Sequence, residues 1–187
     1  MADTVAGTER LILRRWRDAD VELWLEHLNT PEVRRHLGPV DSPEKVAEKF
    51  VRLEASWAKN GYSFLAVERR EDGLFLGACG IADMDSPAAP EEMRGAPEIG
   101  WQLRADCWGH GYATEAARVV LALAFERFGK PVVYSQTSEN NRGSWRVMER
   151  LGMERAEWLD YHDPDYPPEE NPTKVYRLTR QAWTANG

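Results

Sequence analysis

The stretch CWGHGYATEAARVVLALAFERFG, residues 107–129, decides the fold. It joins a glycine turn at residues 109–111 directly to a run of apolar residues at helical spacing, and Gly129 stands where a helix C-cap belongs. Residues 98–104 read as a strand before the turn. Free backbone N–H groups point outward from such a helix start, and the helix dipole adds about half a positive charge there. The order of strand, glycine turn and helix therefore predicts an anion-binding site.

Three kinds of phosphate loop compete for this turn. A Walker A loop needs Gly-Lys-Ser/Thr, which the chain lacks. A dinucleotide fingerprint needs a third glycine where Thr114 stands, and it needs a place at the first strand of a βαβ unit, whereas this loop lies past mid-chain. The third kind is the pyrophosphate loop of acyl-CoA transferases. An ordinary glycine turn before a core helix is the alternative to all three.

Length, charge and cysteine content limit the classes of protein to which the chain can belong. The chain has 187 residues with 42% hydrophobic residues, which fits one globular domain over residues 1–187. Its net charge of −7, without a broad basic stripe, argues against a nucleic-acid partner. No apolar run approaches eighteen residues, so no membrane span is expected, and no signal peptide is visible at the start. The two cysteines lack metal-ligand spacing, so we expect no metal, no disulfide framework and a cytoplasmic location.

The order of expected elements predicts an α/β (α+β) fold. The strand before the glycine turn and the strand after its helix should be parallel, joined by a right-handed crossover. We expect a mixed central sheet of about seven strands, flanked by about four helices on both faces. The expected strands are residues 8–15, 62–68, 74–81, 98–104, 132–137, 153–161 and 174–180, and the expected helices are 18–28, 43–59, 113–128 and 141–151.

With this order, the chain resembles the GNAT acyltransferase superfamily, and within it the Rim-type branch of ribosomal-protein N-terminal acetyltransferases. The similarity covers nearly the whole chain. Three blocks carry it: EIGW at residues 98–101 followed by WGHGYATEA at 108–116, NRGSWRVMERLGM at 141–153, and YRLT at 176–179. The resemblance implies the GNAT fold, acetyl-CoA as donor and co-substrate, and a primary amine as acceptor, and it also allows a homodimer.

The resemblance implies which residues bind acetyl-CoA. Backbone amides of the glycine loop would cradle the pyrophosphate, a strand edge would pair with the pantetheine arm, and the start of the helix at 141–151 would contact CoA. Some of these residues have simpler interpretations: Thr114 as a first-turn threonine, Asn141 as an N-cap, and His110 as a solvent-facing loop residue. The implied set is Trp101, Leu103, Trp108, Gly109, His110, Gly111, Tyr112, Ala113, Thr114 and Asn141.

The expected reaction is direct attack of a free amine on the thioester, so Cys107 is not a nucleophile. Glu98 is the preferred general base, because strand alternation places it on one face with Gly100, which leaves room for substrate. The alternative bases are Asp83, Asp163 and His162, and a purely structural carboxylate is the alternative role for Glu98. A well-placed base contributes about 10²- to 10⁴-fold in rate.

The departing thiolate needs a proton, and the sequence offers two sources for it. Many GNAT enzymes use a tyrosine seven residues beyond the position of Asn141, and here Met148 stands there, which cannot donate a proton. The Rim branch carries serine at the place of Ser144, so we assign Ser144 this role. Water is the alternative proton source for the thiolate.

The acceptor is left open among several classes. An α-amine titrates near a pH of about 8 and lysine near about 10.4, so an α-amine is neutral roughly two orders of magnitude more often at neutral pH. This favours a protein or peptide N-terminus, or a small amine of low pKa. The acidic residues 157–170 would suit a polycationic antibiotic such as an aminoglycoside. A non-catalytic acyl-CoA-binding module is the rival of another class, favoured by Met148.

Overall fold

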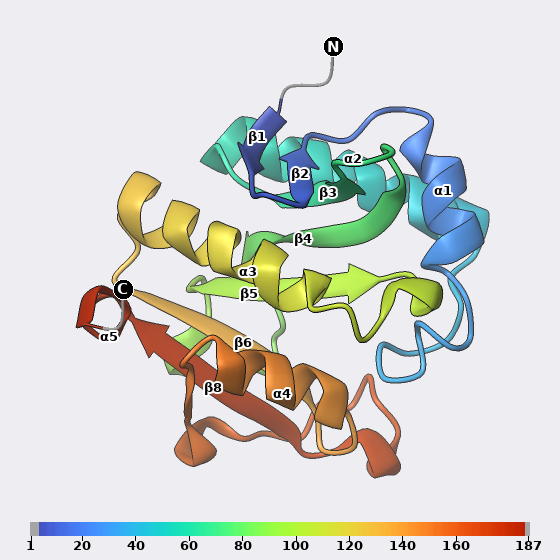
Figure 1. Ribbon diagram of the computed structural model, residues 1–187. Helices are drawn as coiled ribbons and strands as arrows, with labels where there is room; N and C mark the ends of the chain where they lie inside the picture. The colour runs from blue at the N-terminus through green and yellow to red at the C-terminus, as the bar shows by residue number, and fades with distance from the viewer. Residues whose placement is uncertain (1–3, 186–187) are drawn as a thin grey trace. The chain divides into compact units, whose positions relative to one another are not determined.

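The computed structural model describes residues 4–185, which contain eight β-strands and five α-helices (Figure 1). They belong to two compact units. The first unit runs up to Gly80 and includes Trp101–Val119, and the second consists of Ile81–Gly100 and the chain from Val120 on. The α/β class and the mixed sheet are as the sequence predicts, with antiparallel and parallel strand pairs both present.

The first unit is built on four strands that pair antiparallel in chain order, with the glycine loop following them. A hairpin joins the third and fourth strands, as predicted, because the Arg69 N–H donates to the Leu74 carbonyl and the Gly73 N–H to the Arg69 carbonyl. Its elements are β1 (Thr4–Gly7), β2 (Leu11–Arg14), α1 (Asp20–His27), α2 (Pro43–Asn60), β3 (Phe64–Arg69) and the greater part of β4 (Phe75–Asp83).

Helix α2 begins and ends as its sequence predicts. The Ser42 side chain accepts a hydrogen bond from the Lys45 N–H, Pro43 occupies the first turn, and Gly61 ends the helix with a φ of 75°. Figure 1 shows α2 behind the strands of this unit. A buried cluster that includes Trp24 on α1 and Val46 on α2 forms the core here.

Helix α1 starts later than expected. It begins at Asp20, and Asp18 does not cap it. The carboxylate of Asp20 accepts from the Arg17 N–H at 2.7 Å and holds the buried Arg14 guanidinium through two hydrogen bonds of 2.6 and 2.8 Å. The Arg14 guanidinium also contacts Glu68 at 2.6 Å. A buried charge needs such partners, which fixes the start of the helix at Asp20.

The second unit contains the predicted parallel strand pair. The strand β5 (Pro97–Leu103) pairs with β6 (Val132–Ser138) at Glu98↔Tyr134. β6 pairs antiparallel with β8 (Thr173–Thr179), which also pairs with β7 (Glu154–Arg155). Figure 1 shows α4 (Arg142–Arg150) in front of β6 and β8. A cluster around Met84, Met93 and Tyr134 forms the core of this unit.

Several elements differ from the expected ones. β1 and the short α5 (Arg180–Ala185) were not expected, which raises the counts above seven strands and four helices. The helix expected at 113–128 is α3 (Tyr112–Ala122) followed by a π-helical turn, Leu123–Arg127. The strand expected at 153–161 shrinks to β7, because the Asp160 carboxylate accepts the Val175 N–H at 3.1 Å and takes the place of a backbone acceptor.

Within residues 4–185, no helix is both long and apolar enough to cross a bilayer. The same part of the chain contains no group of three or more His, Cys, Asp or Glu side chains that could hold a metal ion. Cys79 and Cys107 are both buried free thiols.

Candidate active site

The glycine loop has the geometry of an anion site. Gly109 and Gly111 adopt φ angles of 80° and 79°, a left-handed region that favours glycine. α3 begins at Tyr112, and the N–H of Glu115 donates to the Gly111 carbonyl at 3.1 Å as the first bond of the helix. The backbone N–H groups before Glu115 therefore have no carbonyl of their own helix to bind, and the positive end of the helix dipole lies there.

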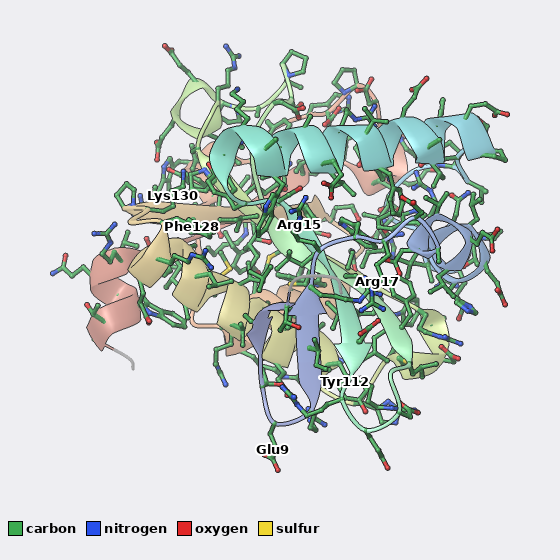
Figure 2. The ribbon with its side chains drawn as sticks, turned by 90° about the horizontal axis from the view of Figure 1, so that it is seen from above. Glu9, Arg15, Arg17, Tyr112, Phe128 and Lys130 are labelled. Atoms are coloured by element: carbon green, nitrogen blue, oxygen red, sulfur yellow. The ribbon has the colours of Figure 1, made fainter. Side chains whose placement is uncertain are left out.

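Arg10 holds this loop from the turn between β1 and β2. Its Nη1 donates to the His110 carbonyl at 3.1 Å, and its Nε donates to Glu115 at 2.7 Å. The guanidinium also lies 4.8 Å from the centre of the Tyr112 ring. Figure 2 labels Tyr112 close to the turn that carries Glu9, the neighbour of Arg10 in the chain. The carbonyl of His110 is thus engaged by a cation, which fixes the orientation of the peptide group between the two glycines.

The side chains of the loop bond to one another and to β5. The exposed Trp108 donates its indole Nε1–H to the Leu103 carbonyl at 2.9 Å. His110 is exposed, stacks on Tyr112, and its Nδ1 lies 2.9 Å from the Trp108 carbonyl, so Nδ1 carries a hydrogen. The Leu103 carbonyl, at the edge predicted for pantetheine, therefore already has a partner within the protein.

The backbone groups of β5 alternate between its two edges. The Arg104 N–H donates to the Leu76 carbonyl on β4 at 2.9 Å, so even-numbered residues of β5 turn their backbone groups toward β4. Odd-numbered residues turn theirs to the other edge. In the described residues, the register of β5 with β6 consists of the single pair Glu98↔Tyr134. Trp101 therefore has its backbone groups on the edge of β5 away from β4, which is the edge predicted to meet pantetheine.

Glu98 is a desolvated carboxyl group in a polar cluster of the second unit. Burial raises the pKa of Glu98 to about 7, a hydrogen bond from Gln136 lowers it in part, and the negative charge of Asp85 raises it. The amide oxygen of Gln136 in turn accepts from the Tyr161 hydroxyl at 2.6 Å. A carboxyl group with a pKa near neutrality can both accept and release a proton at physiological pH.

The helix α4 carries the remaining predicted residues. Asn141 caps it, since its side chain accepts from the Ser144 N–H at 3.3 Å. Ser144 is half-buried in the first turn, and Met148 is buried with 1% of its surface exposed. The position where many GNAT enzymes have tyrosine is therefore filled by a buried apolar side chain.

The rival bases have other surroundings. The Asp163 carboxylate accepts from the Asp165 N–H at 3.0 Å, and its own N–H donates to Asn171. Asp163 therefore organises its loop. His162 is exposed on the same loop. Burial raises the pKa of the Cys107 thiol, which disfavours the thiolate that a nucleophile needs.

Three polar residues at these sites were not found from the sequence. Arg10 lies about a hundred residues before the loop it holds, and nothing in its neighbourhood marks it. Gln136 lies two positions after Tyr134, the partner of Glu98, so the parallel register would have placed it on the face of Glu98. Tyr161 lies at the end of the expected strand that shrinks to β7, and it makes an isolated bridge with Thr173.

A family model described as an acetyltransferase (GNAT) domain matches residues 10–154. The chain belongs to the GNAT acetyltransferase family. The match includes the glycine loop, Glu98, Asn141 and Ser144.

Relatives of the GNAT chain agree with this membership. The uncharacterized protein YkkB of Bacillus subtilis is 31% identical over 155 residues, which cover 81% of this chain and 86% of YkkB. The FsC-acetyl coenzyme A-N(2)-transacetylase of Aspergillus fumigatus is 31% identical over 114 residues, 60% of this chain and 48% of that protein. The crystal structure of an acetyltransferase from Agrobacterium tumefaciens matches at a TM-score of 0.74 and 32% identity, covering 95% of both chains. The GNAT chain is an acetyl-CoA-dependent N-acetyltransferase.

Replacing Arg10 with methionine tests the support of the loop. We expect the KM for acetyl-CoA to rise about three- to tenfold, because the His110 carbonyl loses a charge-assisted hydrogen bond. Steady-state kinetics at saturating amine measures this change. Arg17→Met is the matched control, since Arg17 is equally exposed and contacts Glu68 at 3.4 Å, away from the loop. Equal KM values in the two variants would contradict the role of Arg10.

Proposed function

We propose that this enzyme acetylates a primary amine of low pKa, with a protein or peptide N-terminus as the preferred acceptor. The proposal rests on Glu98, which lies in the polar cluster with Gln136 and Tyr161 and whose pKa burial raises to about 7. A base of this strength is matched to an α-ammonium group of pKa about 8, and poorly matched to a lysine of pKa about 10.4. The resemblance of the three motif blocks to the Rim-type branch favours the same acceptor class.

The reaction we propose is a direct transfer. The amine nitrogen attacks the thioester carbonyl carbon, the C–S bond breaks, and the proton of the attacking nitrogen passes to the Glu98 carboxylate. The departing thiolate takes a proton from water, either directly or through the Ser144 hydroxyl, which donates its own proton and recovers one from water. The thioether of the buried Met148 has no proton to donate. Cys107 takes no part in this sequence.

We propose that the glycine loop binds the donor. Backbone N–H groups from Gly109 to Ala113 would hold the pyrophosphate, and the Thr114 hydroxyl would add a hydrogen bond, with Arg10 keeping the loop in place. The backbone of Trp101 would pair with the pantetheine arm, and the Leu103 N–H would face the oxyanion. Asn141 would contact CoA from the start of α4, in addition to capping that helix.

A second acceptor class has one observation in its favour. The segment from Glu157 to Glu170 is acidic, and its residues Glu157, Asp165 and Glu169 are exposed to solvent. Such a surface would attract a polyamine or an aminoglycoside by long-range attraction between unlike charges.

A panel of acceptors separates these possibilities. Peptides with free α-amines, α-blocked lysine peptides, spermine and an aminoglycoside are compared by thiol release, with the acetylated atom located by mass spectrometry. We expect kcat/KM for α-amine peptides to exceed that for lysine peptides by about two orders of magnitude. A higher kcat/KM for spermine or the aminoglycoside would replace the proposed acceptor. Binding of CoA without transfer to any amine would favour a non-catalytic acyl-CoA-binding module.

The pH dependence of kcat follows from Glu98. The group must be ionised to accept a proton, so kcat should rise with pH through a midpoint of about 7 and level off above it. The same profile measured for Glu98→Gln should be flat in this range. A wild-type profile that falls between pH 6 and 8 would have the wrong sign for a carboxylate base.

A further inference from the structure

Gln136 lies on β6 two residues after Tyr134, the residue that pairs with Glu98 on β5. Because Glu98 pairs with Tyr134, and side chains alternate along a strand, Gln136 shares the sheet face of Glu98. The Gln136 side chain hydrogen-bonds the Glu98 carboxyl group, and this hydrogen bond lowers the pKa of Glu98. The Nε2 atom of the amide also lies 3.6 Å from the Met84 sulfur.

An amide can present either its donor or its acceptor to a neighbour, and Tyr161 decides between these orientations. Its hydroxyl donates to the Gln136 Oε1 at 2.6 Å, which leaves Nε2 as the end available to Glu98. Burial raises the pKa of the Tyr161 hydroxyl well above its usual value, the charges of Asp163 and Glu98 raise it further, and hydrogen bonds with Gln136 and Ser86 lower it only in part. The hydroxyl therefore stays a donor throughout the working pH range.

We infer that Gln136 and Tyr161 are positioning residues for Glu98: Gln136 orients the carboxylate, and Tyr161 holds the amide of Gln136 in its donating orientation. The inference rests on the proposed function only in giving this orientation a catalytic purpose. The charged and titratable groups that act on this cluster are Asp85 toward Glu98 and Asp163 toward Tyr161.

Two variants test the inference. Gln136→Met removes the donor at similar length, and Tyr161→Phe removes only the hydroxyl. Both should lower kcat about three- to tenfold, the size of one hydrogen bond, with the KM for acetyl-CoA unchanged. Both should also shift the midpoint of the kcat profile upward, because the carboxylate loses a donor. Tyr134→Phe is the matched control. Tyr134 is also on β6, but its hydroxyl donates to Glu92 at 2.9 Å and not to Gln136.

Titration of the Glu98 carboxyl carbon by ¹³C NMR separates this inference from the proposed base. If the Glu98 midpoint rises in Gln136→Met and Tyr161→Phe but not in Tyr134→Phe, the positioning role holds. If it rises while kcat stays constant, the positioning role holds and the assignment of Glu98 as base fails. If the Glu98 midpoint is the same in all three variants and the wild type, the inference is overturned.

Discussion

Replacing Glu98 with glutamine is expected to lower kcat by about 10²- to 10⁴-fold, the usual contribution of a positioned general base. The KM for acetyl-CoA should change little, because the predicted donor contacts are made by the backbone of other residues. Glutamine keeps the size of the side chain and can still hydrogen-bond Gln136, but it cannot accept the proton of the attacking amine. Thiol release at saturating concentrations of both substrates measures the loss.

The same variant should remain folded, which can be verified by its stability. The pKa of Glu98 is about 7 in the folded protein against 4.5 in the unfolded chain, so the stabilising contribution of the protonated form is complete below about pH 4.5 and is lost as pH rises through about 7. Glutamine resembles the protonated form. Between pH 5 and pH 8.5, Glu98→Gln should therefore gain on the order of 3 kcal/mol in unfolding free energy relative to the wild type.

Glu92→Gln and Asp163→Asn are the controls for this loss of activity. Glu92 accepts a hydrogen bond from the Tyr134 hydroxyl at 2.9 Å, and Asp163 organises its own loop, so neither variant should reduce kcat by more than a few-fold. A loss in Asp163→Asn as large as that expected for Glu98→Gln, with Glu98→Gln still active, would move the base to the loop.

Replacing Gly111 with valine should raise the KM for acetyl-CoA by about tenfold or more. Gly111 has a φ of 79°, and a β-branched residue pays on the order of 1–3 kcal/mol to adopt that conformation. The loop of the variant would leave this conformation in the free protein, and binding the pyrophosphate would have to restore it. Space is not the cause, since an added Cβ would meet only the Arg10 guanidinium at an ordinary 3.7 Å.

Acetyl-pantetheine makes this prediction specific, because it carries the thioester without the nucleotide and its pyrophosphate. The KM for acetyl-pantetheine should be the same in the wild type and in Gly111→Val. Gly61→Val is the matched control: Gly61 has a φ of 75° and open space around it, but it ends α2 away from the loop. It should lose stability without raising the KM for acetyl-CoA. A similar rise in both variants would attribute the effect to general strain.

Local signals made most of the fold predictable. The Ser42-Pro43 start of α2, the hairpin closed by Gly73 and the parallel pair of β5 and β6 all follow from residues adjacent in the chain or from connection rules. Two of the errors come from side chains that replace backbone partners. Asp160 ends a strand by accepting from Val175, and Asp20 starts a helix by binding Arg14.

The candidate site was predictable only where its chemistry lies in consecutive residues. The glycine loop is such a case, because its conformation needs glycine at 109 and 111 whatever surrounds it. Glu98 could be named from strand alternation, but its raised pKa depends on burial, which no local pattern encodes. Arg10 and Tyr161 reach their partners through tertiary contacts over long sequence separations, so the sequence alone gave no reason to single them out.

Calorimetric titration of the wild-type protein with coenzyme A and with pantetheine tests most directly whether the glycine loop binds the pyrophosphate. We predict saturable binding of one coenzyme A per chain, at least about tenfold tighter than that of pantetheine, a difference of about 1.4 kcal/mol. Equal affinities for the two compounds, or no heat with coenzyme A, would contradict the account.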